Sequence, residues 1–556
     1  MSERFGKGSA ERVGGLWVLH LKGTSFERGL QHGTLMRYRV RDTIDFYRNL
    51  PDLLASRLLS EASLKKRSLG RLKKSTIHRL SKNRDPDAVE ETRGLAVGLG
   101  MKTEDITEAL VLADVIQFAG SKAERSRRGG PPVIPGMGCT SAIRETSSGG
   151  LIFGRNFDFW GAGYWDANPA VFFHHPDKGK AFCSIATAGF PTGGITSINE
   201  DGLAVAVHQH GSRDSSPKGT PIIDIAHNIV RTASNVEEAL EIAGGFRATG
   251  GWSIVIAGGS PPDAAVLEVS SALQKERRLT EGSLVASNYF VDEELSSREL
   301  QYNISTTLSA RLRFMRATEL VSTPRMRPAR MAAILGDHYD ILAERERSAG
   351  FSISNISTLG SVIFSFPEKR FWVSESASPA SKGGYVGFDL EAELCGRPSA
   401  VERVEGGRPP AIKITSAQEK YLEAYKEYIG SGDLGRVLLI LGECSVLDPM
   451  ESTFPLMECI VRAMVGNYRG ALTSVNRSLE LEKVRPKKNV TVLWKARILD
   501  LRDHREQSTK LYEELAENPE SPPIITKAAN RGIRKPFGEK DLGDLIIDFA
   551  NGDTLE

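Results

Sequence analysis

The stretch Gly138-Cys-Thr-Ser-Ala-Ile-Arg-Glu-Thr-Ser-Ser-Gly-Gly-Leu-Ile-Phe-Gly-Arg-Asn-Phe-Asp-Phe159 decides how this chain folds, because it predicts a β-hairpin that begins at a cysteine. The turn residues Thr146-Ser-Ser-Gly-Gly150 separate two apolar-rich runs, a pattern typical of antiparallel strands. The preceding residues, Gly129-Gly-Pro-Pro-Val-Ile-Pro-Gly-Met-Gly138, are rich in glycine and proline. We therefore expect the chain to enter the hairpin from an irregular segment.

The hairpin predicts which residues face Cys139. If the turn is centred near Ser148, the numbers of facing residues sum to about 296, within a boundary error of a few residues. Cys139 then faces Phe157, and Arg155 and Asp158 lie close by on the returning strand. Because alternate strand residues point to opposite faces, Arg155 and Asp158 share one site only at a bulge or a strand end.

These residue types favour nucleophilic chemistry at Cys139. A guanidinium such as that of Arg155 favours the thiolate, which is the reactive form of cysteine. A carboxylate such as that of Asp158 can hold a terminal amine by a charge-assisted hydrogen bond. Gly138 allows the close backbone approach that a scissile bond needs. The pattern indicates an enzyme that cuts its own Gly138–Cys139 bond and uses the liberated Cys139 as nucleophile.

The residues alone leave a second interpretation open. Free cysteine is among the most buried residue types, so Cys139 can also be a small core residue. Arg155 and Asp158 can likewise be a solvated ion pair of little energetic value.

Motifs spread over residues 15 to 380 extend the comparison beyond the hairpin. By these motifs the chain resembles the penicillin acyltransferase-like (acyl-CoA:6-aminopenicillanic acid acyltransferase) branch of the N-terminal-nucleophile cysteine hydrolases, which is related to bile-salt hydrolases and penicillin V acylases. The motifs, in chain order, are Gly23-Thr-Ser-Phe-Glu-Arg-Gly-Leu-Gln-His-Gly33, Glu90-Glu-Thr-Arg-Gly-Leu-Ala-Val-Gly-Leu-Gly100, Gly138-Cys-Thr-Ser141, Gly154-Arg-Asn-Phe-Asp-Phe159, Ile198-Asn-Glu-Asp-Gly-Leu-Ala-Val205, Ser287-Asn-Tyr-Phe290, Arg313-Phe-Met-Arg-Ala317 and Leu359-Gly-Ser-Val-Ile-Phe364.

The resemblance implies a role for each candidate catalytic residue. Cys139 matches the nucleophile, Arg155 the arginine beside the thiol, and Asp158 the carboxylate that holds the new amine. Asn288 matches the asparagine whose side-chain amide helps to form the oxyanion hole. Arg313 matches a second active-site arginine, and the neighbouring Arg311 is an alternative for that place.

Two positions depart from the family pattern. The remaining oxyanion donor is expected to be the backbone N–H of Gln209, where relatives carry asparagine. Tyr289 stands where many acyltransferase relatives have histidine, which leaves the substrate preference open.

We therefore expect a self-processing cysteine-nucleophile hydrolase or acyltransferase that acts on small-molecule acyl amides, with esters and thioesters as further candidates. The alternative is a catalytically silent family member that serves as a scaffold through its C-terminal region.

Changes in residue composition and in hydrophobic periodicity divide the chain into four parts. We expect a helical pro-segment over 1–138 and a catalytic domain over 139–380, where short β-rich runs alternate with helices; the resemblance implies an α+β, four-layer αββα fold there. Residues 381–414 are rich in glycine and proline and are expected to form a linker. Residues 415–556 resemble a tetratricopeptide-type helical domain, because similar tripeptides recur between helical runs: Gly432-Asp-Leu434, Gly466-Asn-Tyr468 and Arg502-Asp-His504. This region either docks a partner or a second copy of the chain, or merely packs on the enzyme.

The composition of the chain limits the classes of binding partner and the cellular compartment that we expect. The net charge of +2 over 556 residues gives no reason to expect nucleic acid as a partner. We expect no membrane span and no signal peptide, and five scattered cysteines fit the reducing cytoplasm. The histidine pairs His174-His175 and His208-Gln-His210 lack acidic or cysteine partners at metal-ligand spacing, so we expect neither metal nor cofactor.

Overall fold

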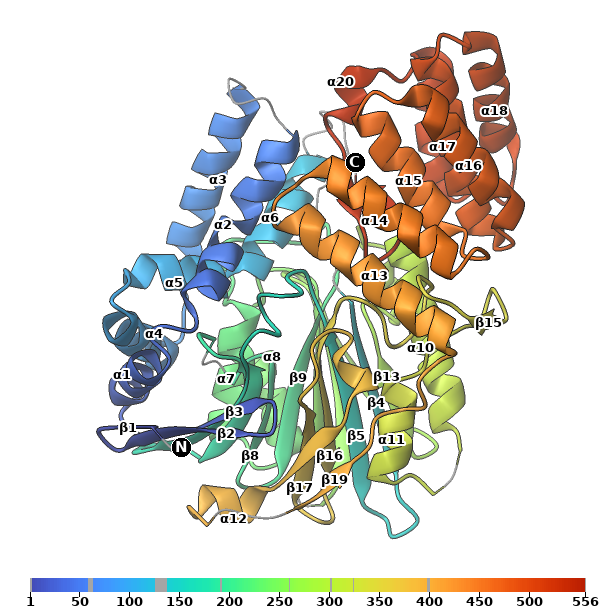
Figure 1. Ribbon diagram of the computed structural model, residues 1–556. Helices are drawn as coiled ribbons and strands as arrows, with labels where there is room; N and C mark the ends of the chain where they lie inside the picture. Colours follow the sequence, from blue (N-terminus) through green and yellow to red (C-terminus); the bar gives the residue numbers. More distant parts are fainter. Residues whose placement is uncertain are drawn as a thin grey trace.

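Two β-sheets packed face to face form the centre of the molecule (Figure 1). The computed structural model describes residues 3–58, 64–125, 138–190, 193–259, 261–300, 303–323, 325–397 and 401–555. The first sheet has ten strands in the order β1 (Glu3–Phe5), β2 (Gly8–Val13), β3 (Leu16–Gly23), β6 (Pro169–Pro176), β7 (Phe182–Thr187), β8 (Thr196–Asn199), β9 (Leu203–Gln209), β10 (Trp252–Gly258), β11 (Asp263–Val269) and β12 (Gln274–Arg278). The second has seven, in the order β13 (Ser283–Ala286), β4 (Gly138–Glu145), β5 (Leu151–Asp158), β16 (Thr358–Ser365), β17 (Arg370–Ser374), β18 (Tyr385–Asp389) and β19 (Val401–Val404).

The predicted hairpin is present as β4 and β5. Gly138 pairs with Asp158 and Cys139 with Phe157, so the expected register is confirmed. Beyond β5, the pairing with β16 shifts by one residue between Thr358 and Gly360. The extra residue of this irregularity is in β16, because β5 pairs with β4 in an unbroken register. Asp158 is the last residue of β5, so it lies at a strand end, one of the two conditions under which Arg155 and Asp158 can share one site. The irregular segment expected before the hairpin lies, up to residue 137, outside the described residues.

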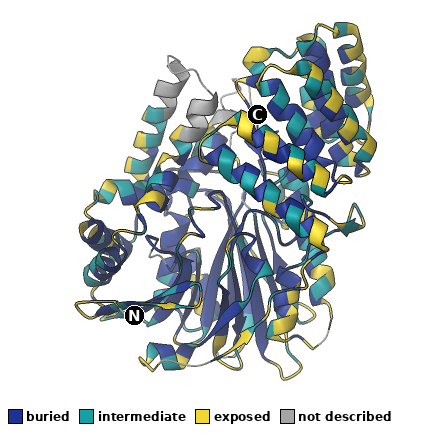
Figure 2. Ribbon diagram, viewed as in Figure 1, coloured by how far each residue is buried: buried dark blue, intermediate teal, exposed yellow. Residues whose placement is uncertain are grey.

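Apolar side chains fill the space between the sheets and cover their outer faces. Ile143 and Phe153 of the hairpin pack with Val171 and Val255 of the ten-stranded sheet. The other face of the seven-stranded sheet packs against two helices, α10 (Ile304–Val321) and α11 (Pro328–Leu335). On the outer face of the ten-stranded sheet lie α7 (Ile222–Thr232) and α8 (Val236–Gly244). The strands are accordingly buried along most of their length (Figure 2).

The N-terminal region is both strand and helix. Strand β3 lies parallel to β6, so residues 16–23 are part of the ten-stranded sheet, and the segment 1–138 expected to be helical also contributes strands. The helices that follow lie on one side of the sheets in Figure 1: α1 (Ser25–Leu35), α2 (Arg41–Leu58), α3 (Leu64–Ser81), α4 (Pro86–Leu99), α5 (Thr103–Leu110) and α6 (Leu112–Arg125).

Glycines explain two of the sequence motifs in this region. Helices α1 and α4 cross so closely that a Cβ at Gly29 would collide with the backbone of Glu91, and one at Gly94 with the backbone of Phe26. Only glycine permits this approach, because its Cα carries no side chain.

Residues 381–414, expected to be a linker, contribute regular structure instead. Strands β18 and β19 extend the seven-stranded sheet beyond β17, and α12 (Leu390–Leu394) lies between them. Phe388 and Val386 are buried in the core between the sheets. Most of the described glycines of this segment lie in its connections, although Gly387 lies within β18, and they obscured the short alternating runs of the strands.

The C-terminal region is almost entirely helical. It comprises α13 (Ile412–Ile429), α14 (Leu434–Leu447), α15 (Thr453–Met464), α16 (Tyr468–Leu481), α17 (Arg485–Leu501), α18 (Arg505–Glu517), α19 (Pro523–Arg534) and α20 (Glu539–Leu542), followed by the hairpin β20 (Ile546–Asp548) and β21 (Asp553–Leu555). The recurring tripeptides precede α14, α16 and α18, where Asp433 and Asn467 cap their helices by accepting backbone N–H groups. None of the helices among the described residues combines the length and the apolar character that crossing a membrane requires.

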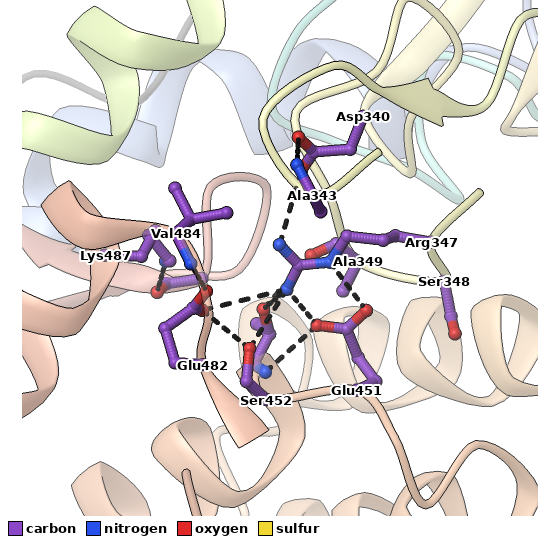
Figure 3. Close-up of polar contacts among 12 residues, drawn as sticks. Asp340, Ala343, Arg347, Ser348, Ala349, Glu451, Ser452, Glu482, Val484 and Lys487 are labelled. Atoms are coloured by element: carbon purple, nitrogen blue, oxygen red, sulfur yellow. Dashed lines mark hydrogen bonds and ion pairs between the residues drawn. The ribbon is translucent and has the colours of Figure 1, made fainter. Parts of the chain in front are cut away.

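A buried arginine joins the C-terminal helices to the sheets (Figure 3). Arg347 follows β15 (Arg345–Glu346), and its guanidinium bonds both carboxylate oxygens of Glu451, which lies between α14 and α15. It also donates to Asp340 at 3.3 Å and to Ser452 at 3.1 Å. Arg347 and Glu451 are only 2% and 0% exposed, so neither charge is solvated by water.

Replacing Arg347 by methionine is expected to destabilise the protein by about 3–5 kcal/mol, because two buried carboxylates lose their cation. The neighbouring Arg345 is the matched control, since its side chain is 37% exposed and lies 3.6 Å from the same Glu451. Arg345→Met should change the stability by less than about 1 kcal/mol. Chemical denaturation of the three proteins measures the difference, and equal effects of the two substitutions would contradict the interpretation.

Candidate active site

Cys139 is the second residue of β4 and lies in a polar site between the two sheets. Its side chain is buried, and Arg155 Nη2 donates to its Sγ at 3.6 Å. Arg155 is held in place by two backbone carbonyls of the facing sheet, that of Val207 at 2.7 Å and that of Ile195 at 2.8 Å. The sulfur is therefore not part of a purely apolar core.

The surroundings of Cys139 act on its protonation in opposite directions. Burial raises the pKa of the Cys139 thiol above its usual value, whereas the Arg155 and Arg313 guanidiniums act to lower it and Asp158 acts to raise it. Burial has the larger effect, so the arginine reduces the cost of forming the thiolate without abolishing it.

Asp158 lies across the hairpin from the bond that precedes Cys139. A Cβ at residue 138 would lie 2.8 Å from Asp158 Oδ2, closer than Cβ atoms approach other atoms, so glycine is needed there. Asn355 Nδ2 donates to the same oxygen at 3.2 Å. Burial raises the pKa of the Asp158 carboxyl, while the positive charge of Arg313 opposes that rise.

Asn288, which follows β13, holds the backbone nitrogen of Cys139. Its Oδ1 accepts the Cys139 N–H and also a hydrogen bond of 3.1 Å from Arg313 Nη2. Its Nδ2 donates to the carbonyl of Gln209 at 2.9 Å. Because both Arg313 and the peptide N–H are donors, they fix which end of the amide faces Cys139.

Arg313, on the buried face of α10, reaches the site from the opposite side to Arg155. Its Nη1 donates to the carbonyl of Cys139 at 2.6 Å and to Thr140 Oγ1 at 2.9 Å. The alternative, Arg311, is exposed, and its guanidinium lies 5.7 Å from the centre of the Tyr289 ring. Of the two arginines, Arg313 therefore contacts Cys139.

The backbone N–H of Gln209 points toward the same region. His210 N–H donates to Gly251 beside β10, whereas Val207 N–H donates to Ile195 on the opposite side of β9. Since the N–H groups alternate along a strand, that of Gln209 points away from β10. The Gln209 carbonyl lies on that side too, because it accepts the amide of Asn288.

The sequence did not predict a role at this site for four further residues, Thr140, Ser141, His208 and Asn355. Thr140 and Asn355 contact Arg313 and Asp158, respectively. His208 Nε2 lies 2.8 Å from Ser141 Oγ, two residues along β4 from Cys139, and burial lowers the pKa of His208 well below its usual value. Ser141 follows the candidate cysteine in the hairpin, so strand alternation was the signal that placed it on the same face.

Two of the histidines considered as metal ligands, His208 and His210, pair with serines. His208 contacts Ser141, and His210 Nε2 lies 2.7 Å from Ser253 Oγ. Elsewhere Asp85, Asp87 and His227 bring ligand atoms within 4.8 Å of one another near the start of α4.

That cluster already contains cations. Arg231 Nη1 lies 2.9 Å from Asp87, and Arg28 Nη2 lies 3.4 Å from it. The carboxylate is thereby compensated, so the arrangement is an ion-pair network.

The structure thus has a mixed α/β fold in which a buried cysteine, two arginines and a carboxylate meet at the start of β4. Residues 144–378 match the sequence model of the family described as acyl-coenzyme A:6-aminopenicillanic acid acyl-transferase. The resemblance to this family is thus confirmed for that segment, which contains Arg155, Asp158, Asn288 and Arg313 and begins five residues after Cys139.

Two further proteins resemble the chain more distantly. An uncharacterized protein of Archaeoglobus fulgidus is 25% identical over 287 residues, which are 47% of this chain and 45% of that protein. The chain therefore spans less than half the length of this relative. A solved N-acylethanolamine-hydrolyzing acid amidase ortholog of Caenorhabditis elegans has 13% identity and a TM-score of 0.31, over 41% of this chain and 92% of its own. This last likeness is too distant to carry an argument about activity.

Proposed function

We propose that the protein is a self-processing cysteine-nucleophile amidohydrolase or acyltransferase. The observation that carries the proposal is the position of Cys139, whose sulfur contacts Arg155 and whose backbone nitrogen is held by Asn288. The acyltransferase family match over the adjacent residues supports a small-molecule acyl substrate. Amides are the expected substrates, with esters and thioesters as further candidates.

Self-cleavage begins with attack of the Cys139 sulfur on the carbonyl carbon of Gly138. The bond between that carbon and the Cys139 nitrogen breaks, the nitrogen takes up the thiol proton, and Gly138 becomes a thioester. Water then hydrolyses the thioester, which yields a Gly138 carboxylate and a free Cys139 thiol. Asp158 lies beside Gly138 and is placed to hold the new amine.

In turnover the same sulfur attacks the substrate carbonyl, and the α-amine of Cys139 acts as general base and acid. An α-amine has an ordinary pKa of about 7.7–8.0, close to the operating pH. The Gln209 N–H and Asn288 Nδ2 are the candidate donors for the tetrahedral oxyanion, and Nδ2, which donates to the Gln209 carbonyl in the uncut chain, would turn to the oxyanion in turnover. Loss of one such donor typically costs about 10²–10³ in rate.

Aromatic side chains beside Cys139 support an apolar acyl group. Phe157 faces Cys139 across the hairpin, and its ring centre lies 4.9 Å from that of Trp165 and 5.8 Å from that of Phe159. Apolar and aromatic walls are typical of small-molecule sites with a few placed polar groups.

The proposal includes the four-layer αββα fold for 139–380, a pro-segment over 1–138 and a tetratricopeptide-like region over 415–556. The pairing of β3 with β6 supports a two-fragment enzyme that stays together after the cut. The five cysteines are all free thiols, which supports a reducing compartment such as the cytoplasm.

Intact mass analysis of the purified protein tests the proposal. We expect two fragments under denaturing conditions, one ending at Gly138 and one beginning at Cys139, that elute together from a native sizing column. A panel of N-acyl amides, acyl esters and acyl thioesters then identifies the bond that is cut.

The silent scaffold is the competing function, and the same experiment separates the two. A scaffold has no need of cleavage or of a reactive thiol. An uncut chain that turns over none of the panel and whose Cys139 is not labelled by iodoacetamide would establish the scaffold and refute the enzyme.

A further inference from the structure

A pocket lies among α14, α15 and α16, outside the segment that matches the acyltransferase family. It has a volume of about 420 Å³. Its lining combines acidic, basic and hydroxyl side chains: Asp448, Glu458, Arg462, Arg477, Ser445 and Ser474. Apolar surface comes from Pro449, Pro455 and Leu481. A pocket with a few convergent polar groups is a candidate ligand site.

The polar groups of this pocket keep unused bonding capacity. Arg462 Nη2 and Ser474 Oγ each lie 3.4 Å from Glu458, and Arg477 Nη2 lies 3.4 Å from the Pro449 carbonyl. Protein hydrogen bonds are usually about 2.7–3.2 Å long, so these contacts are weak. Two other contacts have ordinary lengths: Ser445 Oγ donates to Glu458 at 2.8 Å, and Arg477 Nη1 lies 3.0 Å from Glu480. The Arg477–Glu480 pair is exposed to solvent and is therefore of little energetic value. Arg462 Nε is shielded from solvent and has no acceptor among the described residues.

The pocket is lined by both carboxylates and guanidiniums, which restricts the charge that a ligand can carry. One wall residue, Glu451, is already compensated by the buried Arg347 (Figure 3). Among the described residues Asp448 accepts only neutral donors, at 2.5 Å from Ser348 Oγ and 3.3 Å from the backbone nitrogen of Met450. A simple anion would therefore meet the Asp448 and Glu458 carboxylates, and a simple cation would meet the guanidiniums.

We propose that this pocket binds a small zwitterion of the amino-acid class, such as a free dipeptide. The ligand's ammonium pairs with Asp448 and Glu458, and its carboxylate pairs with Arg462 and Arg477. The apolar walls accept uncharged side chains, and the volume exceeds what a single small amino acid needs. The site does not depend on the chemistry at Cys139.

Calorimetric titration of the full-length protein with leucyl-leucine tests the proposal. We expect saturable binding that weakens about tenfold to hundredfold when the peptide is N-acetylated, and again when its carboxylate is amidated, because each cap removes one charge pair. Arg477→Gln should cause a similar loss and keep the fold, since this side chain is 51% exposed.

The matched control is Arg469→Gln, an exposed arginine on α16 that does not line the pocket. It should bind leucyl-leucine as the unaltered protein does. Thr473→Trp, which fills the pocket from an exposed wall position, should abolish binding. Equal binding of the free and capped peptides, no saturable binding at millimolar concentration, or full binding by Thr473→Trp would each overturn the proposal.

Discussion

Replacing Cys139 by alanine is expected to leave the chain in one piece and to abolish turnover. The sulfur is the atom that attacks both the Gly138 carbonyl and the substrate, so its loss removes both reactions at once. The rate with an acyl substrate should fall by on the order of 10³-fold or more, as is usual when a nucleophile is removed. A denaturing gel and a substrate assay measure the two effects on one preparation.

The matched control is Cys395→Ala, because Cys395 is exposed and lies at the end of α12. This variant should be cut and remain active. Cys139→Ser separates the two steps, since a hydroxyl can still attack but is much less acidic than a thiol. A Cys139→Ala protein that still yields a fragment beginning at residue 139 would refute the assignment of the nucleophile.

Replacing Arg155 by methionine should shift the pH dependence of Cys139 reactivity upward. Burial raises the pKa of the Cys139 thiol, and the positive charge of Arg155 is the largest of the effects that lower it. Without the guanidinium the pKa rises further, so at a fixed neutral pH the thiolate fraction falls. A rise of one unit lowers that fraction about tenfold.

The rate of iodoacetamide labelling at Cys139, measured as a function of pH, reports this shift. Arg155→Lys should recover part of it, because a cation remains beside the sulfur. Arg311→Met is the matched control, since Arg311 is exposed and stacks near Tyr289. An unchanged pH profile in Arg155→Met, with the variant folded, would show that Arg155 does not tune the thiol. The variant also leaves the carbonyls of Val207 and Ile195 without a donor, so its stability should fall by about 1–3 kcal/mol per carbonyl.

The hairpin of β4 and β5 shows which structural features can be predicted from the local sequence pattern. Turn residues and strand alternation predicted that Cys139 faces Phe157, and the pairing confirms it. The same alternation predicted that Arg155 and Asp158 share one site only at a bulge or a strand end, and β5 ends at Asp158. The irregular pairing of β16 beside it, at Thr358 to Gly360, joins strands about 200 residues apart in the chain, so neither sequence segment predicts it alone.

The segment 381–414 illustrates the opposite case. Its glycines and prolines predicted a linker, yet Phe388 and Val386 are buried between the sheets. Strand propensity depends strongly on the environment, and these short runs become strands because β17 offers them an edge to pair with.

Residues 138–158 therefore carried enough information to predict a hairpin and its register, because those features arise from contacts between near neighbours. Folding alone brought Asn288 and Arg313 to the backbone of Cys139, since they stand 149 and 174 residues away from it along the chain. It likewise decided the salt bridge of Arg347 to Glu451 and the pocket among α14, α15 and α16. Such features depend on how sheets and helices pack on one another, and no periodicity within a single segment encodes that packing.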